Sequence, residues 1–250
     1  MDVHTLPTCC PVLELRQYTL HPGKRDQLIQ LFEREFIESQ EALGMRLVGQ
    51  FRDLDNPDRF VWLRGFADMT TRAPALQEFY GGPVWKALRE TANETMIDSD
   101  NVLLLRPAHP GSAFPLEHLE RQPRGATGNP PGLFVATICH LKEGESGEKI
   151  AELSEDTMRS EMSKTGASLL ACFATEHHPN TFPALPVRED ANVIVWFSML
   201  TDQTGDESHD APRVRASVWP DKIAEELRDR VKSDPEILRL RPTPRSRLHG

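Results

Sequence analysis

NVLLLRP at residues 101–107 and EILRLRP at residues 236–242 are nearly the same, and each closes one copy of a repeated unit. Two tryptophans recur 134 positions later along the chain: Trp62 and Trp85 return as Trp196 and Trp219. A repeat of this length is too long for a solenoid unit and matches a whole small domain. The sequence therefore predicts two copies of one domain in tandem.

The spacing between the copies changes once along the chain. Upstream it is 122 positions, since Gly44 and Phe51 correspond to Gly166 and Phe173. The difference is accounted for by an insertion at residues 176–192, which contains several prolines and two histidines. The second copy is therefore predicted to carry an extra loop that the first copy lacks.

Within each copy, apolar periodicity predicts the order strand, helix, strand, strand, helix, strand. In the first copy the strands are expected at 12–20, 46–52, 60–67 and 102–106, and the helices at 24–43 and 71–97, the latter interrupted at residues 81–83. In the second copy the strands are expected at 133–141, 168–175, 193–201 and 237–241, and the helices at 148–164 and 212–232. This is the ferredoxin-like order, in which a four-stranded sheet carries both helices on one face.

The resulting domain division is a first repeat at 12–107, a linker at 108–132 and a second repeat at 133–242. The linker is rich in proline and glycine and shows little periodicity. Strands such as FVWLRGFA and VIVWFSML are apolar on both faces, so the face without helices also needs cover. We therefore expect an α+β protein in which two tandem ferredoxin-like (βαββαβ) units pack sheet to sheet as an intramolecular α/β barrel.

Composition excludes several classes of protein. Hydrophobic residues make up 38% and charged residues 27%, as in a folded globular chain. A net charge of −9 argues against nucleic acid and against an acidic membrane surface as partners. The four cysteines, including adjacent Cys9 and Cys10, lack the spacing of a zinc site or a disulfide framework. With no secretion signal and no apolar stretch of ~20 residues, we expect a cytoplasmic protein.

The opening of the first repeat, ELRQYTLHPGK at residues 14–24, places Glu14, Arg16 and Tyr18 on alternate positions before a proline–glycine turn. Together with the following phenylalanine-rich helix and VWLRGFAD, this pattern resembles the NIPSNAP family. In the second repeat, FVATICHLKEG keeps the strand without the arginine and tyrosine. The resemblance implies a dimeric α/β-barrel fold, which related barrels use in monooxygenases, isomerases and decarboxylase-like enzymes. It implies no activity common to the family.

Glu14, Arg16 and Tyr18 point to one side of their strand and would form a polar cluster inside the barrel. Arginine can bind a carboxylate or enolate oxygen in a fork, and tyrosine can donate a proton to it. His21, in the following turn near the barrel mouth, is the candidate general base. Arg16, Tyr18 and His21 are therefore the predicted catalytic residues, with Glu14 beside the substrate. The alternative is a structural ion pair with no catalytic role.

Further substrate-binding candidates lie on the third strand and the second helix. Trp62 and Arg64 share a face and suit an anionic or planar ligand, unless Arg64 merely solvates an edge strand. Tyr80 precedes two glycines at a helix start, and Trp85 follows, although repeated tryptophans also occur in cores. The corresponding positions of the second repeat are less polar: Val135, Thr137, Cys139 and Ser198. A pocket would therefore be lopsided and formed mainly by the first repeat.

Three functions remain open from the sequence. The first is a cofactor-independent, monooxygenase- or isomerase-like enzyme acting on a small anionic, aromatic or enolizable substrate in the barrel, with no metal. The second is a non-catalytic module that presents the linker and residues 176–192 to a protein partner. The third is a haem-binding barrel with His140 or His178 as ligand. Whole chains could also pair as a homodimer of pseudo-dimers.

Overall fold

The computed structural model describes residues 10–116, 119–128, 130–200 and 211–249. Its strands are β1 (Val12–Leu20), β2 (Arg46–Asp53), β3 (Arg59–Phe66), β4 (Met96–Pro107), β5 (Leu133–His140), β6 (Ala167–Thr175), β7 (Val193–Leu200) and β8 (Glu236–Pro242). Its helices are α1 (Arg25–Leu31), the π-helical turn η1 (Phe32–Phe36), α2 (Ile37–Glu41), α3 (Met69–Gly81), α4 (Pro83–Asn93), α5 (Gly147–Lys164), α6 (Ala211–Val218) and α7 (Asp221–Leu227). Cys9 and the predicted strand end at Thr201 lie outside the described residues.

The eight strands close into one barrel in the order β1-β3-β2-β8-β5-β7-β6-β4. Strands β4-β1-β3-β2 belong to the first repeat and β6-β7-β5-β8 to the second, each in ferredoxin-like order. The barrel closes at two seams, β2 with β8 and β4 with β6, each with three paired positions. The predicted fold of two ferredoxin-like units packed sheet to sheet is confirmed.

The repeat is also visible in the strand register. Arg16 lies opposite Trp62 in the pair β1–β3, and Thr137 lies opposite Trp196 in the pair β5–β7. Glu14 is likewise opposite Arg64, as Val135 is opposite Ser198. The positions aligned between the two copies from the sequence therefore occupy equivalent places in the two sheets.

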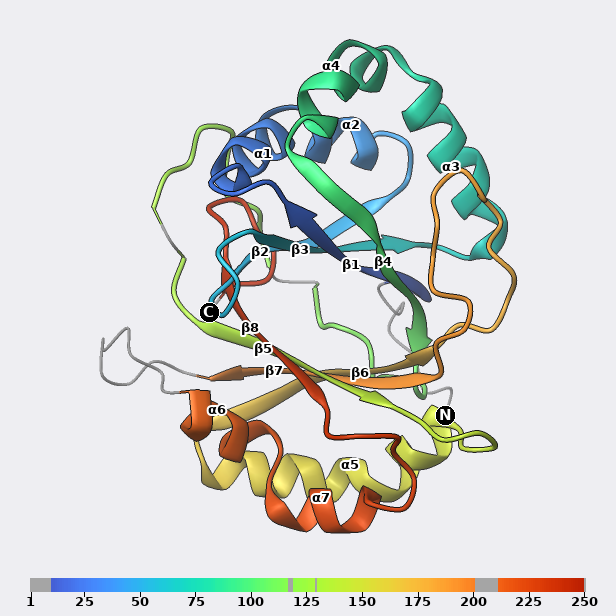
Figure 1. Cartoon of the computed structure of the whole chain (residues 1–250), viewed down its shortest axis with the longest axis vertical. Helices are drawn as coiled ribbons and strands as arrows, with labels where there is room; N and C mark the ends of the chain where they lie inside the picture. The colour runs from blue at the N-terminus through green and yellow to red at the C-terminus, as the bar shows by residue number, and fades with distance from the viewer. Residues whose placement is uncertain (1–9, 117–118, 129, 201–210, 250) are drawn as a thin grey trace, which may run out of the picture.

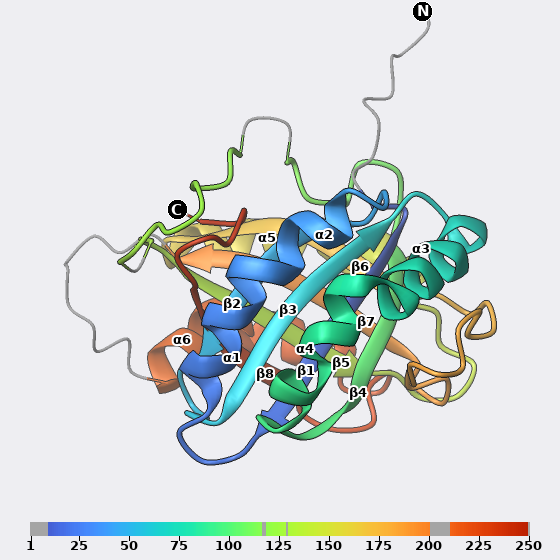
Figure 2. The ribbon, with the colours of Figure 1, turned by 90° about the horizontal axis from the view of Figure 1, so that it is seen from above.

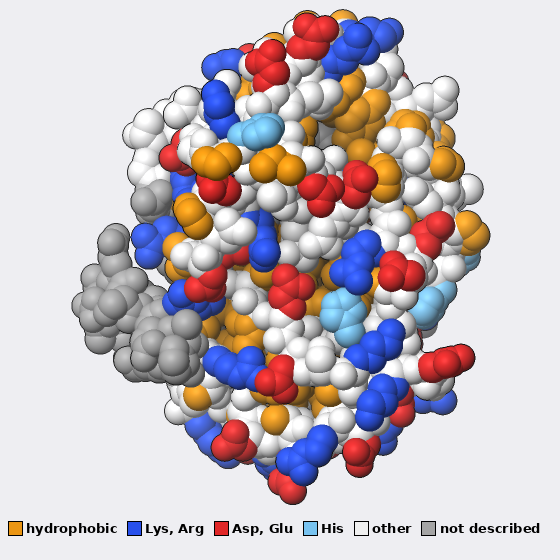
Figure 3. All heavy atoms as spheres, viewed as in Figure 1, with side chains coloured by type: hydrophobic (Ala, Val, Ile, Leu, Met, Phe, Trp, Pro, Cys, Tyr) orange, Lys and Arg blue, Asp and Glu red, His pale blue; other side chains and the backbone are white. Residues whose placement is uncertain are grey.

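Helices cover the outer face of each sheet, as Figure 1 shows, with α1 to α4 over one sheet and α5 to α7 over the other. Seen from above in Figure 2, the first-repeat helices lie across β1 and β3. Among the described residues, no helix combines the length and the apolar character that crossing a membrane requires. On the face drawn in Figure 3, charges of both signs are interspersed, and apolar side chains gather beside α4.

The barrel interior is filled with apolar side chains. Leu13 and Leu15 of β1 pack there, with aromatic residues from both repeats: Phe51, Phe134, Phe173 and Phe197. The segment between the repeats adds Phe114, whose ring lies 5.4 Å from Phe173 and 5.0 Å from Phe197. Side chains therefore fill the space between the two sheets. A haem placed between the sheets would have to displace them.

The expectation that the polar row faces this interior is wrong. Tyr18 packs with Phe32, Phe36 and Phe79 in the layer between the first sheet and its helices. Alternation along a strand shows which residues share a face but not which face meets the helices. Here the leucines of β1 enter the barrel, so Glu14, Arg16 and Tyr18 lie on its outer side.

Three predicted helices have different limits. The helix expected at 24–43 is interrupted by η1, and the one at 212–232 breaks before Pro220, which precedes α7. The helix expected to reach residue 97 ends at Asn93, because Met96 already pairs with Leu20 of β1. Tertiary strand pairing outweighs local propensity there.

Candidate functional site

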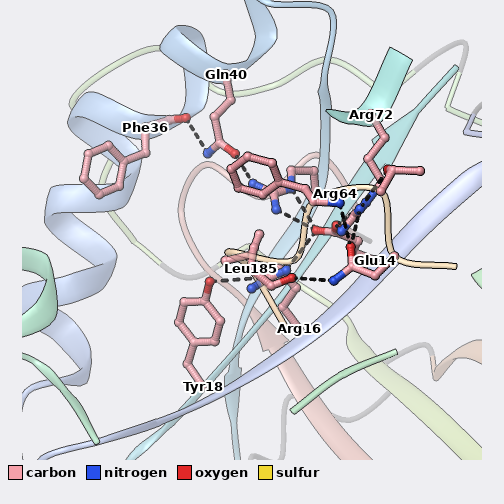
Figure 4. Close-up of polar contacts among 11 residues, drawn as sticks. Glu14, Arg16, Tyr18, Phe36, Gln40, Arg64, Arg72 and Leu185 are labelled. Atoms are coloured by element: carbon pink, nitrogen blue, oxygen red, sulfur yellow. Dashed lines mark hydrogen bonds and ion pairs between the residues drawn. The ribbon is translucent and has the colours of Figure 1, made fainter. Parts of the chain in front are cut away.

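One carboxylate and three guanidiniums form a buried cluster on the helix side of the first sheet. Glu14 Oε2 accepts hydrogen bonds from Arg16 Nη1 at 3.0 Å and from Arg64 Nη2 at 2.6 Å. Glu14 Oε1 accepts from Arg72 Nε at 2.8 Å. All four side chains have an exposed fraction of 0%. Figure 4 shows them converging from β1, β3 and α3, and we name them the Glu14 cluster.

The Glu14 cluster carries more positive than negative charge. Burial by itself would raise the pKa of Glu14, but the charges of Arg64, Arg16 and Arg72 outweigh it and lower the pKa to about 2. The carboxyl group is therefore ionised at neutral pH, and arginine stays protonated. Two positive charges remain without a carboxylate inside the cluster, which is costly for fully buried groups.

Tyr18 connects the cluster to the space under the helices. Its hydroxyl accepts a hydrogen bond from Arg16 Nε at 3.0 Å, and its ring meets Trp62 edge-on at 5.7 Å. Burial raises the pKa of Tyr18 above its ordinary value of 10.0, against the opposing charge of Arg16. The hydroxyl therefore keeps its proton at neutral pH and can donate it in a hydrogen bond, with Arg16 polarising the oxygen.

Gln40 holds Arg64 from the helix layer. Its side-chain oxygen accepts from Arg64 Nη1 at 2.8 Å, and its side-chain nitrogen donates to the carbonyl oxygen of Phe36 at 2.8 Å. Phe36 ends the π-helical turn η1, a wider turn that often occurs at functional sites. The interrupted helix thus places the side-chain amide of Gln40 between the Phe36 carbonyl group and Arg64 of the Glu14 cluster.

A cavity with mainly aromatic walls lies beside Tyr18. Its volume is about 90 Å³, and the larger space of about 530 Å³ around it includes open solvent. It is lined by Tyr18, Leu28, Phe32, Phe36, Gln40, Trp62, Phe79, Tyr80, Trp85, Ala92, Asn93, Met96, Ser99 and Leu185. We call this space the first-repeat cavity.

Two buried donors near the cavity have no acceptor among the described residues, Arg16 Nη2 and Trp62 Nε1. The Arg16 guanidinium carbon lies 5.4 Å from the Trp62 ring centre, so both groups belong to one neighbourhood. Buried donors are normally paired, and an unpaired one is costly. Together with the Tyr18 hydroxyl, the arrangement is suited to an acceptor such as an anionic oxygen.

The sequence-predicted residues are distributed as follows. Tyr18, Trp62, Tyr80 and Trp85 line the first-repeat cavity, whereas Glu14, Arg16 and Arg64 are buried next to its polar end. His21 is exposed in the turn after β1 and does not line the cavity. The alternative that Arg64 solvates an edge strand is wrong, because β3 lies between β1 and β2 and Arg64 is buried.

Sequence reasoning missed Gln40 and Arg72. Arg72 lies on the buried stripe of α3 with Leu76 and Phe79, at helical spacings of four and seven. A charged residue at an apolar position of an amphipathic helix was the signal that could have identified it. Gln40 gave a similar signal, four residues after Phe36 on the buried side of its helix.

The histidines considered as haem ligands lie apart from the cavity. His140 is half-buried at the end of β5, where burial, together with Arg188 and Lys232, lowers its pKa. His178 is exposed, and its Nδ1 lies 2.6 Å from Glu176 Oε1. In the described part of the chain, no group of three or more histidine, cysteine or acidic side chains could hold a metal ion.

The second repeat has lost this chemistry. Val135, Thr137 and Ser198 occupy the places of Glu14, Arg16 and Arg64. Thr137 Oγ1, Ser198 Oγ and Trp196 Nε1 are buried and have no partner among the described residues. The polar site therefore exists in one repeat, as the sequence indicated.

Comparison with known families gives one match, the NIPSNAP model, over residues 13–110. The first repeat is a NIPSNAP domain. The match begins at β1 and ends just after β4, so it includes the whole Glu14 cluster. No curated protein matches the sequence.

Solved structures show a similar fold over nearly the whole chain. A "putative monooxygenase" from Lactobacillus acidophilus NCFM is 15% identical, with a TM-score of 0.53, over 92% of this chain and 93% of that chain. A "putative monooxygenase" from Fusobacterium nucleatum subsp. nucleatum ATCC 25586 is 11% identical, with a TM-score of 0.55, over 94% and 93%. At these identities the similarity concerns the fold alone.

Proposed function

We propose that this NIPSNAP-type protein is a cofactor-independent small-molecule enzyme whose substrate carries an anionic or enolizable oxygen on a largely apolar or aromatic body. The observation that carries the proposal is the first-repeat cavity, where aromatic walls meet the Tyr18 hydroxyl and a buried cluster with excess positive charge. Fixed donors and charges of this kind stabilise negative charge strongly when water is excluded. The site lies between the sheet and its helices rather than inside the barrel.

The chemistry follows from what the site can stabilise. When a carbon next to a carbonyl loses its proton, the electron pair moves onto the carbonyl oxygen. Tyr18 would donate a hydrogen bond to that oxygen, with Arg16 behind it. Among the described residues, no carboxylate or histidine lines the cavity. The lack of a base in this wall favours a substrate that is acidic enough to bind as an enolate or phenolate. For a less acidic substrate that reaches the turn after β1, His21 is the candidate base.

The test compares 4-nitrophenol with 4-nitrotoluene, which has nearly the same shape but no ionisable oxygen. We expect the phenolate to bind at least about tenfold more tightly by calorimetry, and the absorbance of bound 4-nitrophenol to show a pKa lowered by about one unit or more. Equal affinity for the two compounds, or an unchanged phenol pKa on binding, would contradict the anion site.

Turnover requires a separate measurement. Oxygen consumption with phenols and enols tests the monooxygenase-like reaction, and exchange of the α-hydrogen of keto acids for deuterium in D₂O tests the isomerase-like one. Thr137→Val, the substitution at the second-repeat position equivalent to Arg16, serves as the control because it leaves the cavity untouched. Phenolate binding without oxygen consumption or exchange across both series would indicate a binding protein instead of an enzyme.

A further inference from the structure

The inserted loop 176–192 belongs to the second repeat but lies against the first. In Figure 1 it rises from the lower sheet beside α3. Both ends are attached to β4, since Glu176 N donates to Leu104 O at 2.9 Å and Arg188 N donates to Val102 O at 2.8 Å. The loop is thus fixed to the first sheet at its two ends.

The middle of the loop contacts the Glu14 cluster. Arg72 Nη1 donates to Asn180 Oδ1 at 2.9 Å and to Thr181 Oγ1 at 3.3 Å. The same guanidinium donates to Glu14 through Nε. One buried arginine therefore joins the loop of the second repeat to the carboxylate of the first.

One apolar side chain of the loop lines the first-repeat cavity, and another packs against the cavity wall. Phe182 stacks on Tyr80 with ring centres 6.0 Å apart and an interplanar angle of 17°. Leu185 lines the cavity with Tyr18, and Figure 4 labels both residues. Asn180 fixes this arrangement internally, because its Nδ2 donates to Leu185 O at 3.0 Å and its Oδ1 accepts from Phe182 N at 3.0 Å.

The geometry points to loop 176–192 as the specificity-determining wall of the site, with Leu185 setting the size of the substrate. The selection of a substrate by size rests on the proposed function. That the loop covers the cavity rests on the contacts alone. Among the residues that the structure describes, Leu185 is the one cavity-lining residue that the second repeat contributes. A wall from a separate loop can change size without disturbing the polar groups on β1 and β3.

The test uses the full chain and a series of 2-alkyl-4-nitrophenols from 2-methyl to 2-butyl, which ionise near neutral pH as the proposed substrate class requires. The wild type is expected to bind the short members and to exclude the long ones. Leu185→Ala should improve the affinity for 2-butyl-4-nitrophenol relative to 2-methyl-4-nitrophenol by about tenfold, because a pocket discriminates by one to two methylenes on this scale. Val187→Ala is the matched control, since it shortens an apolar side chain of the same loop that does not line the cavity.

A second readout does not depend on the ligand. Trp62 and Trp85 lie in the cavity wall, so opening the loop side should increase the quenching of tryptophan fluorescence by acrylamide in Leu185→Ala and not in Val187→Ala. Circular dichroism and thermal melting establish that both variants are folded.

The outcomes separate the two proposals. If the wild type binds phenols but Leu185→Ala and Val187→Ala shift the size preference alike, the loop inference fails and the proposed function stands. If no phenol binds but quenching rises in Leu185→Ala alone, the proposed substrate class fails and the loop stands as the cover of the cavity. Unchanged quenching in both variants, with unchanged preference, overturns the loop inference.

Discussion

Glu14 is a single carboxylate facing three guanidiniums, and this imbalance determines how the site responds to substitution and to pH. Each of its oxygens is used by at least one arginine, and water does not reach it. Removing one partner of a buried ion pair leaves the others uncompensated, which costs more than the pair itself contributes. Substitutions at this residue should therefore have large effects on stability.

Glu14→Gln is expected to lower the free energy of unfolding by about 3–5 kcal/mol, because three buried arginines lose their shared carboxylate. Urea denaturation at neutral pH measures the change. Glu35→Gln removes a carboxylate from an exposed pair with Arg34 and should cost no more than about 1 kcal/mol. Equal losses in the two variants would show that the cluster is not the stabilising feature we infer.

The same carboxylate gives stability a defined pH dependence. Its pKa in the folded protein is about 2, below the ordinary value of 4.5, so its contribution is complete above pH 4.5 and is lost as the pH falls toward 2. The difference in unfolding free energy between wild type and Glu14→Gln should shrink over this window by roughly 3 kcal/mol. Denaturation curves across this pH range measure it, and a constant difference would contradict the assignment.

Tyr18→Phe tests the hydroxyl separately from the charge. The ring and its edge contact with Trp62 remain, but the donor to the substrate oxygen is lost. We expect the affinity for 4-nitrophenolate to fall by about tenfold or more, with little effect on 4-nitrotoluene. Parallel calorimetry with both compounds measures this, and an equal loss for both would indicate a packing role.

The sequence placed Glu14, Arg16 and Tyr18 on one face of their strand, and Trp62 with Arg64 on one face of another strand, because alternation along a strand is a strict geometric rule. It did not reveal that this face meets the helices, since that depends on which side each helix covers. Arg72 and Gln40 were missed because they lie on the buried faces of helices, where only apolar side chains were expected. Their roles become visible when the elements are in place.

Among the elements, η1 is the one whose geometry matters most for the site. The π-helical turn interrupts a helix whose apolar pattern predicted a continuous segment, and Gln40 follows it. Similarly, β4 extends through MIDSD, whose polar residues conceal the strand from pattern analysis. Strand order and helix existence could be predicted from periodicity, whereas helix ends and the π-turn depend on tertiary contacts.

Gln40→Leu is expected to destabilise the protein by about 2–3 kcal/mol, because Arg64 loses an acceptor and the Phe36 carbonyl loses a donor inside the helix layer. Gln77→Leu, on the exposed side of α3, should stay within about 0.5 kcal/mol. Chemical denaturation compares the two. A neutral Gln40→Leu would mean that η1 holds its form without this amide.

At the scale of the whole molecule, the two seams are of the same type, since each joins the second strand of one repeat to the last strand of the other. The duplication predicted that the two sheets cover each other as a barrel, because each has an apolar face without helices. It did not predict which strands join at the seams. The filling of the barrel by Phe114 could not be predicted, since its segment lacks periodicity. Pairing of whole chains and a protein partner stay predictions.

Residues 10–116 expressed alone are expected to form a homodimer. Separation would expose the leucines of β1 and the free edges of β2 and β4, and a second copy offers the same edges in return. Size-exclusion chromatography with light scattering measures the mass, with the full chain run in parallel. A stable monomer of this fragment would contradict the equivalence of the seams.

The loop at 176–192 is present once, and this has a consequence for how the protein could change over time. In a homodimer every mutation is present in both subunits. A new loop that lined the cavity of one subunit would therefore also line the cavity of the other. Joining the halves covalently removes that constraint, and each position can drift without its counterpart. One half could then keep the polar groups of the site while the other supplied the loop that covers them. The expected stoichiometry is therefore one ligand per chain.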